Sequence, residues 1–137
     1  MLLLDWKLVG SEWDLVHFHE WLNKHQFVLG GNWDYRQGSY DRRLDGEKQM
    51  VWLRIPFAVI HGELDSSAPQ PGTRIRVQQP FVLHHIYNKG NDDTAQLATL
   101  GALVNQFQTP IDPDAPVPDA YEKIALELLA HLERDKP

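Results

Sequence analysis

The chain has 137 residues, a formal net charge of −6 at pH 7 and no cysteine. This length predicts a single domain over residues 1–137, and the lack of cysteine excludes disulfides, a thiolate nucleophile and cysteine-ligated metals. The negative charge argues against nucleic-acid binding, because it repels a phosphate backbone. No stretch approaches the roughly 20 apolar residues of a membrane helix, and the first leucines are too few for a signal peptide, so we expect a cytoplasmic protein without membrane contact.

The first predicted element is a helix that begins at Ser11, which can cap its N-terminus, and ends near His25. Leu15, Phe18 and Leu22 recur at helical spacing and would form its buried face.

Four strands are predicted next from alternating apolar residues, over 27–35, 39–44, 51–59 and 75–87. Turns are expected at Gly38, at Asp45-Gly46 and in the proline-containing stretch 65–72. Pairing Phe57 with Phe81 gives the sheet a core face of Leu53, Ile55, Phe57, Val77, Phe81 and Leu83. Pro56 on the other face marks a bulge or a strand edge.

Two further helices complete the prediction, one with an apolar stripe from Leu97 to Phe107 and one that follows Pro118. Residues 108–119 carry four prolines, which predicts an extended connector. The fold class is therefore α+β, a four-stranded antiparallel sheet with helices on one face in the order α-β-β-β-β-α-α. We expect the last helix to pack in cis, and a dimer-forming arm is the alternative.

The seven histidines form no recognisable metal motif. His61 and Glu63 share a strand face, but the pairing above puts His61 opposite Val77 and leaves His84 and His85 about 25 Å away along the ladder. We therefore expect no metal site and no cofactor, with His85 packed inward and His84 exposed.

The densest group of polar and aromatic residues lies in the stretch 32–43, which contains Trp33-Asp34-Tyr35 and, after a spacer, Tyr40-Asp41. A tight hairpin around Gln37-Gly38 would make Tyr35 face Tyr40 and Asp34 face Asp41. Facing carboxylates repel unless a cation or a shared proton lies between them. Either they bind arginines or turn amides, which we favour, or they form an acid pair at a binding site. The candidate binding residues are Trp33, Asp34, Tyr35, Tyr40, Asp41, Arg42 and Arg54.

The Trp-Asp-Tyr and Tyr-Asp pair followed by basic residues resembles the signature of the YugN-like family of small bacterial proteins. Leu53-Arg54-Ile55-Pro56, Gly62-Glu63-Leu64 and His84-His85-Ile86-Tyr87 follow in the order that this family shows. The resemblance implies a small α+β bacterial protein inside the cell, and it implies neither a cofactor nor catalytic residues.

No nucleophile motif or phosphate-binding loop is found along the chain. The sequence therefore favours a non-enzymatic binding or interaction domain, and a homodimer is left open. The alternative is a small-molecule-binding protein or enzyme that uses Asp34 and Asp41. An apolar cavity containing both residues would favour the alternative, and an exposed aromatic surface would favour the interaction domain.

Overall fold

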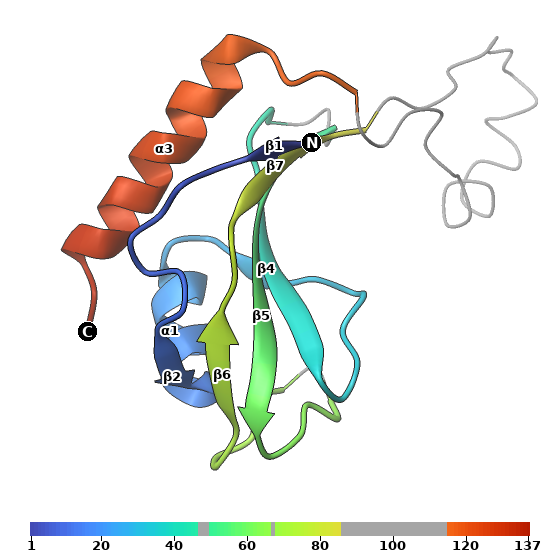
Figure 1. The fold of residues 1–137 in the computed structure, drawn as a ribbon, viewed down its shortest axis with the longest axis vertical. Helices are drawn as coiled ribbons and strands as arrows, with labels where there is room; N and C mark the ends of the chain where they lie inside the picture. The colour runs from blue at the N-terminus through green and yellow to red at the C-terminus, as the bar shows by residue number, and fades with distance from the viewer. Residues whose placement is uncertain (47–49, 67, 86–114) are drawn as a thin grey trace, which may run out of the picture.

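The computed structural model describes residues 1–46, 50–66, 68–85 and 115–137. These residues form one antiparallel sheet of seven strands and two helices (Figure 1). The strands are β1 (Leu2–Leu3), β2 (Glu12–Asp14), β3 (Val28–Leu29), β4 (Gln37–Arg43), β5 (Val51–His61), β6 (Arg74–Val77) and β7 (Phe81–His84), and the helices are α1 (Leu15–Lys24) and α3 (Asp119–Arg134). The α+β class is confirmed, but the prediction of four strands and of a leading helix is wrong.

Strand β5 is the central strand of the sheet and pairs with three others. β5 pairs with β4 along one edge, and along the other edge it pairs first with β7 and then with β6. The strand order is β1-β7-β5-β4-β3, and β2 extends the sheet by pairing with β6. The predicted alternation in β5 is confirmed, since Leu53, Ile55 and Phe57 are all fully buried. The antiparallel connection from β4 to β5 is also present, and the Met50 amide donates to Asp45 in the turn.

The predicted N-cap of the first helix, Ser11, is wrong by three residues, because residues 12–14 form β2 and Asp14 is the N-cap. Trp13 lies opposite Ile75 of β6, and the Ser11 carbonyl accepts a hydrogen bond from the Val77 amide. The Ser11 hydroxyl donates to the Leu8 carbonyl at 2.6 Å and caps nothing. Strand pairing with a distant segment outweighs the local helix signal here.

The predicted fourth strand is two strands, β6 and β7, separated by residues 78–80. Phe57 lies opposite Val77 and Leu53 lies opposite Val82, so the predicted pairing of Phe57 with Phe81 is wrong by four residues. Phe81 and Leu83 consequently lie on the opposite face from Leu53, beside their partners Arg54 and Trp52. Phe81 is half-buried there, whereas Leu83 is buried but does not belong to the common core cluster. Ile75 is fully buried on the same face as Val77, as the alternation predicts, and Val82 is the fully buried residue of β7 that the prediction put on the other face.

Pro56 occupies the point on β5 where its neighbour changes from β7 to β6. Its carbonyl accepts a hydrogen bond from the Gln78 amide at 2.9 Å. Because the carbonyl and the nitrogen of one residue point to the same side of an antiparallel strand, the Pro56 nitrogen also faces the gap between β6 and β7. A proline fits here because the missing N–H would meet no regular ladder partner.

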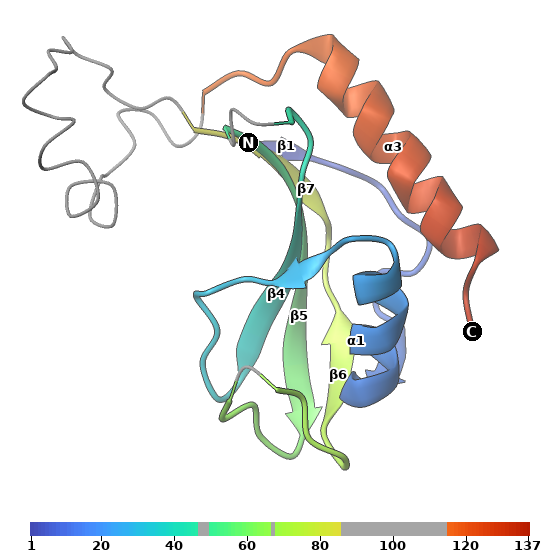
Figure 2. The same cartoon turned by 180° about the vertical axis from the view of Figure 1, so that it is seen from behind.

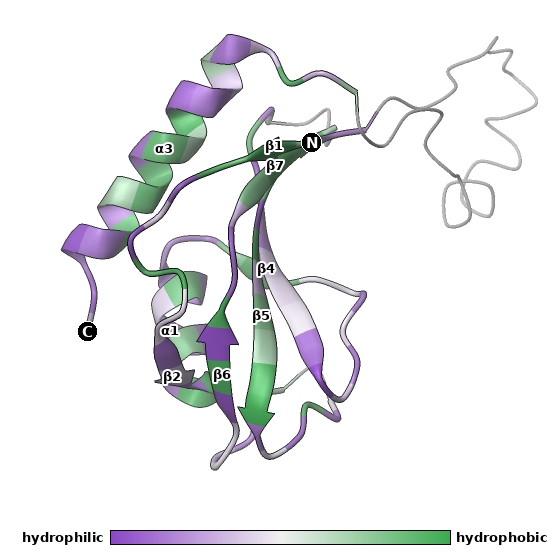
Figure 3. Cartoon of the chain, viewed as in Figure 1, coloured by the Kyte–Doolittle hydropathy of each residue, from purple (hydrophilic) through white to green (hydrophobic). Residues whose placement is uncertain are grey.

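Helices α1 and α3 lie on the same side of the sheet (Figures 1 and 2). Ala125, Leu129 and Leu132 of α3 belong to the same buried cluster as Phe18 and Leu53, so the apolar face of α3 covers the core. Hydrophobic colour runs along β5 and alternates with polar colour on α3 (Figure 3). Ile124 of α3 points to the solvent side and is 39% exposed. Neither described helix is long and apolar enough to cross a membrane.

The predicted helix with the stripe Leu97 to Phe107, the strand residue Tyr87 and the connector as far as residue 114 lie outside the described residues. The described end of the connector, residues 115–118, contains neither helix nor strand and leads directly into α3.

Candidate functional site

The Trp-Asp-Tyr motif does not form the predicted tight hairpin. β3 contains only Val28 and Leu29, which lie opposite Asp41 and Tyr40, and Asp34 forms an isolated bridge with Gln37. Asp34 therefore lies beside Gln37, and Asp41 is four residues further along β4, a rise of about 13 Å. The carboxylates of Asp34 and Asp41 do not face each other. The predicted pairing is wrong because the chain turns at residues 34–37, earlier than Gln37-Gly38.

Asp41 forms a nearly buried ion pair. Its residue is 7% exposed, and its two oxygens accept from Arg54 Nε and Nη2, both at 3.0 Å, while the Ser39 hydroxyl donates to Oδ1 at 3.1 Å. A methyl group on Gly30 would lie 2.8 Å from Asp41 Oδ2. Asp41 is therefore covered by the Gly30 backbone and held by Arg54 and Ser39.

Tyr40 is fully buried and points into the core. Its ring lies 5.5 Å from that of Phe18 and 5.7 Å from that of Phe57, and its hydroxyl shares a hydrogen bond of 2.8 Å with His19 Nδ1 on α1. Burial raises the pKa of the Tyr40 phenol well above its usual range. The phenol therefore remains protonated and serves the packing of α1 on the sheet.

Two more of the candidate residues, Arg42 and Trp33, are also engaged. Arg42 Nη1 donates to the His25 carbonyl at 2.8 Å, at the end of α1, and burial lowers the pKa of its guanidinium. Trp33 is half-buried and packs against the core cluster. Of the seven candidate residues, the structure brings Asp41 and Arg54 into a direct ion pair and turns Tyr40 away from them.

Tyr35 is the exception, because its side chain is 62% exposed although its backbone is firmly held. Asp34 Oδ1 accepts the amides of Arg36 and Gln37 at 2.8 and 3.0 Å. The Val59 amide donates to the Arg36 carbonyl at 2.7 Å, and the Leu64 amide donates to the Tyr35 carbonyl at 3.3 Å. The motif thus builds a fixed turn that presents Tyr35 to solvent.

A hollow of about 330 Å³ lies between this turn and the end of β5, lined by Tyr35, Arg36 and residues 59–63; we call it the Tyr35 hollow. A bulge between Val59 and His61 interrupts the pairing of β5 with β6 at this point, and bulges commonly redirect side chains next to functional sites. Gly62 has φ +79°, and a methyl group there would meet Gly72 O and Thr73 Cα at 3.1 Å. The Gly62 segment is therefore close-packed against the 72–73 backbone.

Four polar side chains around the Tyr35 hollow are exposed: Tyr35, Arg36, His61 and Glu63. Within the part of the chain that the structure describes, none of them makes a side-chain hydrogen bond or an ion pair. The sequence had suggested arginines of this stretch only as counter-ions to the two aspartates, and His61 with Glu63 only as metal ligands. Gly62 between them, with a conformation suited to glycine, is the one local signal that residues 61–63 form a special turn.

The register places His61 opposite Arg74, so its predicted partner Val77 is wrong. His84 lies opposite Val51, ten residues from His61 along β5, which is about 33 Å. His84, predicted to be exposed, is half-buried and its Nδ1–H donates to the Pro116 carbonyl at 2.8 Å. Among the described residues no group of three histidine, aspartate or glutamate side chains could hold a metal ion.

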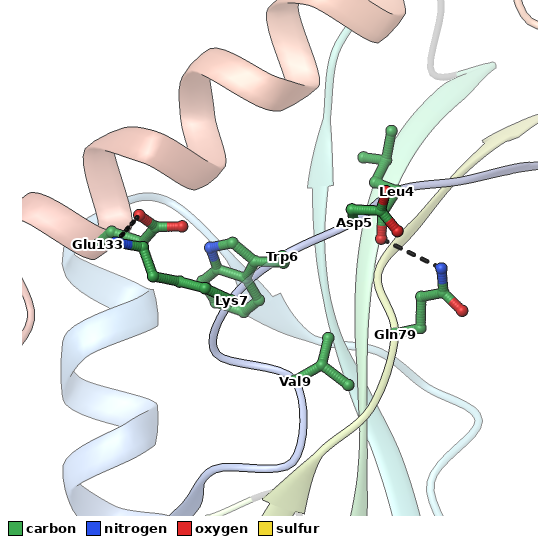
Figure 4. A pocket seen from close by; sticks show the side chains of 7 residues that line it. All are labelled: Leu4, Asp5, Trp6, Lys7, Val9, Gln79 and Glu133. Atoms are coloured by element: carbon green, nitrogen blue, oxygen red, sulfur yellow. Dashed lines mark hydrogen bonds and ion pairs between the residues drawn. The ribbon is translucent and has the colours of Figure 1, made fainter.

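A larger hollow of about 530 Å³ lies where the N-terminal segment meets the end of α3 (Figure 4). Its polar side chains are mostly engaged: Gln79 donates to the Leu4 carbonyl and Lys7 pairs with Glu133 at 3.6 Å. Trp6 Nε1 has no partner among the described residues, but this atom is buried beneath the surface and offers a ligand no accessible donor. Asp34 and Asp41 line neither hollow.

Together, the fold and the site define a small α+β domain in which an antiparallel sheet carries two helices and presents a fixed turn at one end. The chain belongs to the YugN-like family, whose model matches residues 3–135. This membership confirms the resemblance seen in the sequence.

One relative is the protein named "Uncharacterized protein YugN" from Bacillus subtilis (strain 168). It is 32% identical over 107 residues, which cover 78% of this chain and 77% of the relative. The crystal structure of the uncharacterized conserved protein YugN from Geobacillus kaustophilus HTA426 matches with a TM-score of 0.68 and 19% identity, covering 98% of this chain and 93% of the other. At that identity the likeness shows the shared fold alone.

Proposed function

We propose that this protein is a non-enzymatic interaction domain that binds a partner at the Tyr35 hollow. One observation carries the proposal: a tyrosine that is 62% exposed is held on a turn whose backbone is fixed by five hydrogen bonds. These are the two amides on Asp34, the bond from the Asp34 amide to the Gln37 carbonyl, and the bonds from the Val59 and Leu64 amides.

Preorganisation supports this function. A turn that is already ordered loses little conformational entropy when a partner binds, so more of the contact energy remains as affinity. Tyrosine and arginine are also the side chains over-represented among the residues that dominate protein interfaces. Tyr35 and Arg36 are adjacent on this turn, and both are exposed.

The alternative function, a small-molecule site built on Asp34 and Asp41, needs the two carboxylates side by side. They are separated by about 13 Å along β4, and each already accepts hydrogen bonds from its own surroundings. This geometry favours the interaction domain over the alternative.

We also infer that the protein acts in the cytoplasm and does not bind nucleic acid. A chain without cysteine suits a reducing compartment. The net charge of −6 opposes a phosphate backbone.

Photo-crosslinking in cells tests the proposed site. A photoreactive phenylalanine analogue replaces Tyr35 in one variant and Leu126, which is 43% exposed on α3, in the control. We expect a discrete crosslinked product from position 35 that position 126 does not give, and that weakens when Arg36→Ala or Ile60→Ala is added. The same products from both positions, no product from position 35, or a product insensitive to both added substitutions would contradict the proposal.

A further inference from the structure

We propose that the Tyr35 hollow recognises an exposed protein segment that carries an acidic and a basic side chain close together. This inference rests on the function proposed above and adds the chemical class of the partner. Arg36 would bind the acidic group, Glu63 would bind the basic group, and Tyr35 with Ile60 would contact the apolar part of the segment.

The first argument is the charge of the hollow. Arg36 and Glu63 have opposite charges and line the same hollow, yet neither forms an ion pair within the described parts of the chain. A ligand with only one sign of charge would be attracted by one of them and repelled by the other. A ligand with both signs can satisfy both side chains at once.

The second argument is shape and polarity. At about 330 Å³ the hollow lies at the small end of the range for sites that enclose a small molecule, and such sites are mostly apolar. Here the lining side chains Tyr35, Arg36, His61 and Glu63 are exposed. Such a surface suits side chains that project from a larger partner, and it encloses too little of a free compound.

The third argument concerns the apolar surface beside these charges. Ile60 is 38% exposed at the bulge of β5, and Tyr35 is exposed on the facing turn. A tyrosine ring offers a large contact area while it loses few rotamers on binding. A phosphate group, alone or in a nucleic acid, would leave this apolar surface unused and would meet the charge of Glu63.

The experiment is selection from a displayed library of random 12-residue peptides on four proteins: the wild type, Arg36→Glu, Glu63→Arg and the double variant. We expect the wild type to enrich peptides that contain both acidic and basic residues. Each single reversal should weaken binding of a wild-type peptide by roughly 3- to 10-fold, as for one exposed charge contact. The double variant should recover a mixed-charge preference in its own selection.

Enrichment of peptides with a single sign of charge, or of no peptide at all, would overturn the mixed-charge class. Equal selection by all four proteins would overturn it as well. The proposed function fails on a different measurement, namely if Tyr35→Ala leaves the affinity of every selected peptide unchanged and position 35 gives no specific crosslink in cells. Because all substituted side chains are exposed, thermal melting of each variant should match the wild type and serves as the control for folding.

Discussion

Asp41 accepts two hydrogen bonds of 3.0 Å from Arg54, whereas both bonds of Asp34 come from backbone amides. The difference follows from position. Asp41 lies in the middle of β4 beside Arg54 of β5, where the partner is another side chain, and Asp34 begins a turn whose free amides need an acceptor. A substitution that removes the charge but keeps an acceptor oxygen therefore separates the two roles.

Asp41→Asn should lower the free energy of unfolding by about 2–3 kcal/mol, because Arg54 loses a charged partner in a largely buried place. Asp34→Asn should cost less than about 1 kcal/mol, since the amide oxygen can still accept the Arg36 and Gln37 amides. Urea denaturation of the two variants measures both values. A larger loss for Asp34→Asn than for Asp41→Asn would show that the assignment of roles is reversed.

Tyr40 makes stability depend on alkaline pH. Burial raises the pKa of its phenol in the folded state, so above the usual value near 10 the unfolded chain loses a proton that the folded chain keeps. Stability should consequently fall as the pH rises above about 10, by up to about 1.4 kcal/mol per pH unit from this one group.

Denaturation at several pH values between 9 and 11.5 measures this effect. Tyr40→Phe should be less stable at pH 7, because the bond to His19 is lost, but its stability should fall less steeply above pH 10. Tyr35→Phe is the matched control, since Tyr35 is exposed, and it should keep the wild-type slope. Parallel slopes for Tyr40→Phe and the wild type would contradict this account.

At the scale of elements, β5 could be predicted because its alternation of buried and half-buried residues is unbroken from Val51 to Phe57. The division into β6 and β7 could not be predicted from the sequence. The three residues between these strands change which residues face the core, and the apolar residues after Val77 still resemble a continuation of the same strand. β2 was missed for a related reason: three residues paired with β6 carry a strong local signal for a helix start.

The candidate site, too, could be predicted only in part from the sequence. The sequence identified the motif at Trp33-Asp34-Tyr35, since its composition is local. It could not show that Tyr35 is exposed while Tyr40 is buried, because the turn is fixed by amides of Val59 and Leu64, which are distant in sequence. The Tyr35 hollow also depends on the bulge in β5, which no pattern of residues in the sequence predicts.

Helix α3 offers a matched pair of leucines. Leu129→Ala should lower the free energy of unfolding by about 2–5 kcal/mol, because Leu129 is 2% exposed within the common core. Leu126→Ala, the same change on the exposed side of the same helix, should change it by less than about 0.5 kcal/mol. Chemical denaturation decides the matter, and equal effects would mean that α3 does not contribute its buried face to this core.

At the scale of the whole molecule, the C-terminal end of α3 is tied to the end of α1. Asp135 accepts from His25 Nε2 at 2.8 Å and pairs with Lys24 Nζ at 3.1 Å. The hydrogen bond from His25, with a further bond from Lys24, lowers the pKa of the Asp135 carboxyl. Since the charged form is favoured in the fold, this tie is present above the usual pKa of aspartate and is lost as the pH falls through the lower folded value.

The whole fold should form without a metal ion, because the histidines of β5 and β7 are far apart and the chain has no cysteine. Dialysis against EDTA should leave the melting temperature within about 1 °C of the untreated protein, well below the shift that losing even 1 kcal/mol causes in a domain of this size. Adding back zinc or magnesium serves as the control. A fall of several degrees that zinc reverses would show a metal site that the geometry does not reveal.

Three indole rings meet where the N-terminal segment, β2 and α1 come together. Trp21 lies 4.8 Å from Trp13 and 6.4 Å from Trp6, measured between ring centroids. At such separations the electronic transitions of the rings couple, so the near-ultraviolet circular dichroism of the native protein should be dominated by this trio. The chain thus carries an intrinsic optical reporter of whether its first twenty residues have docked, which needs no attached dye.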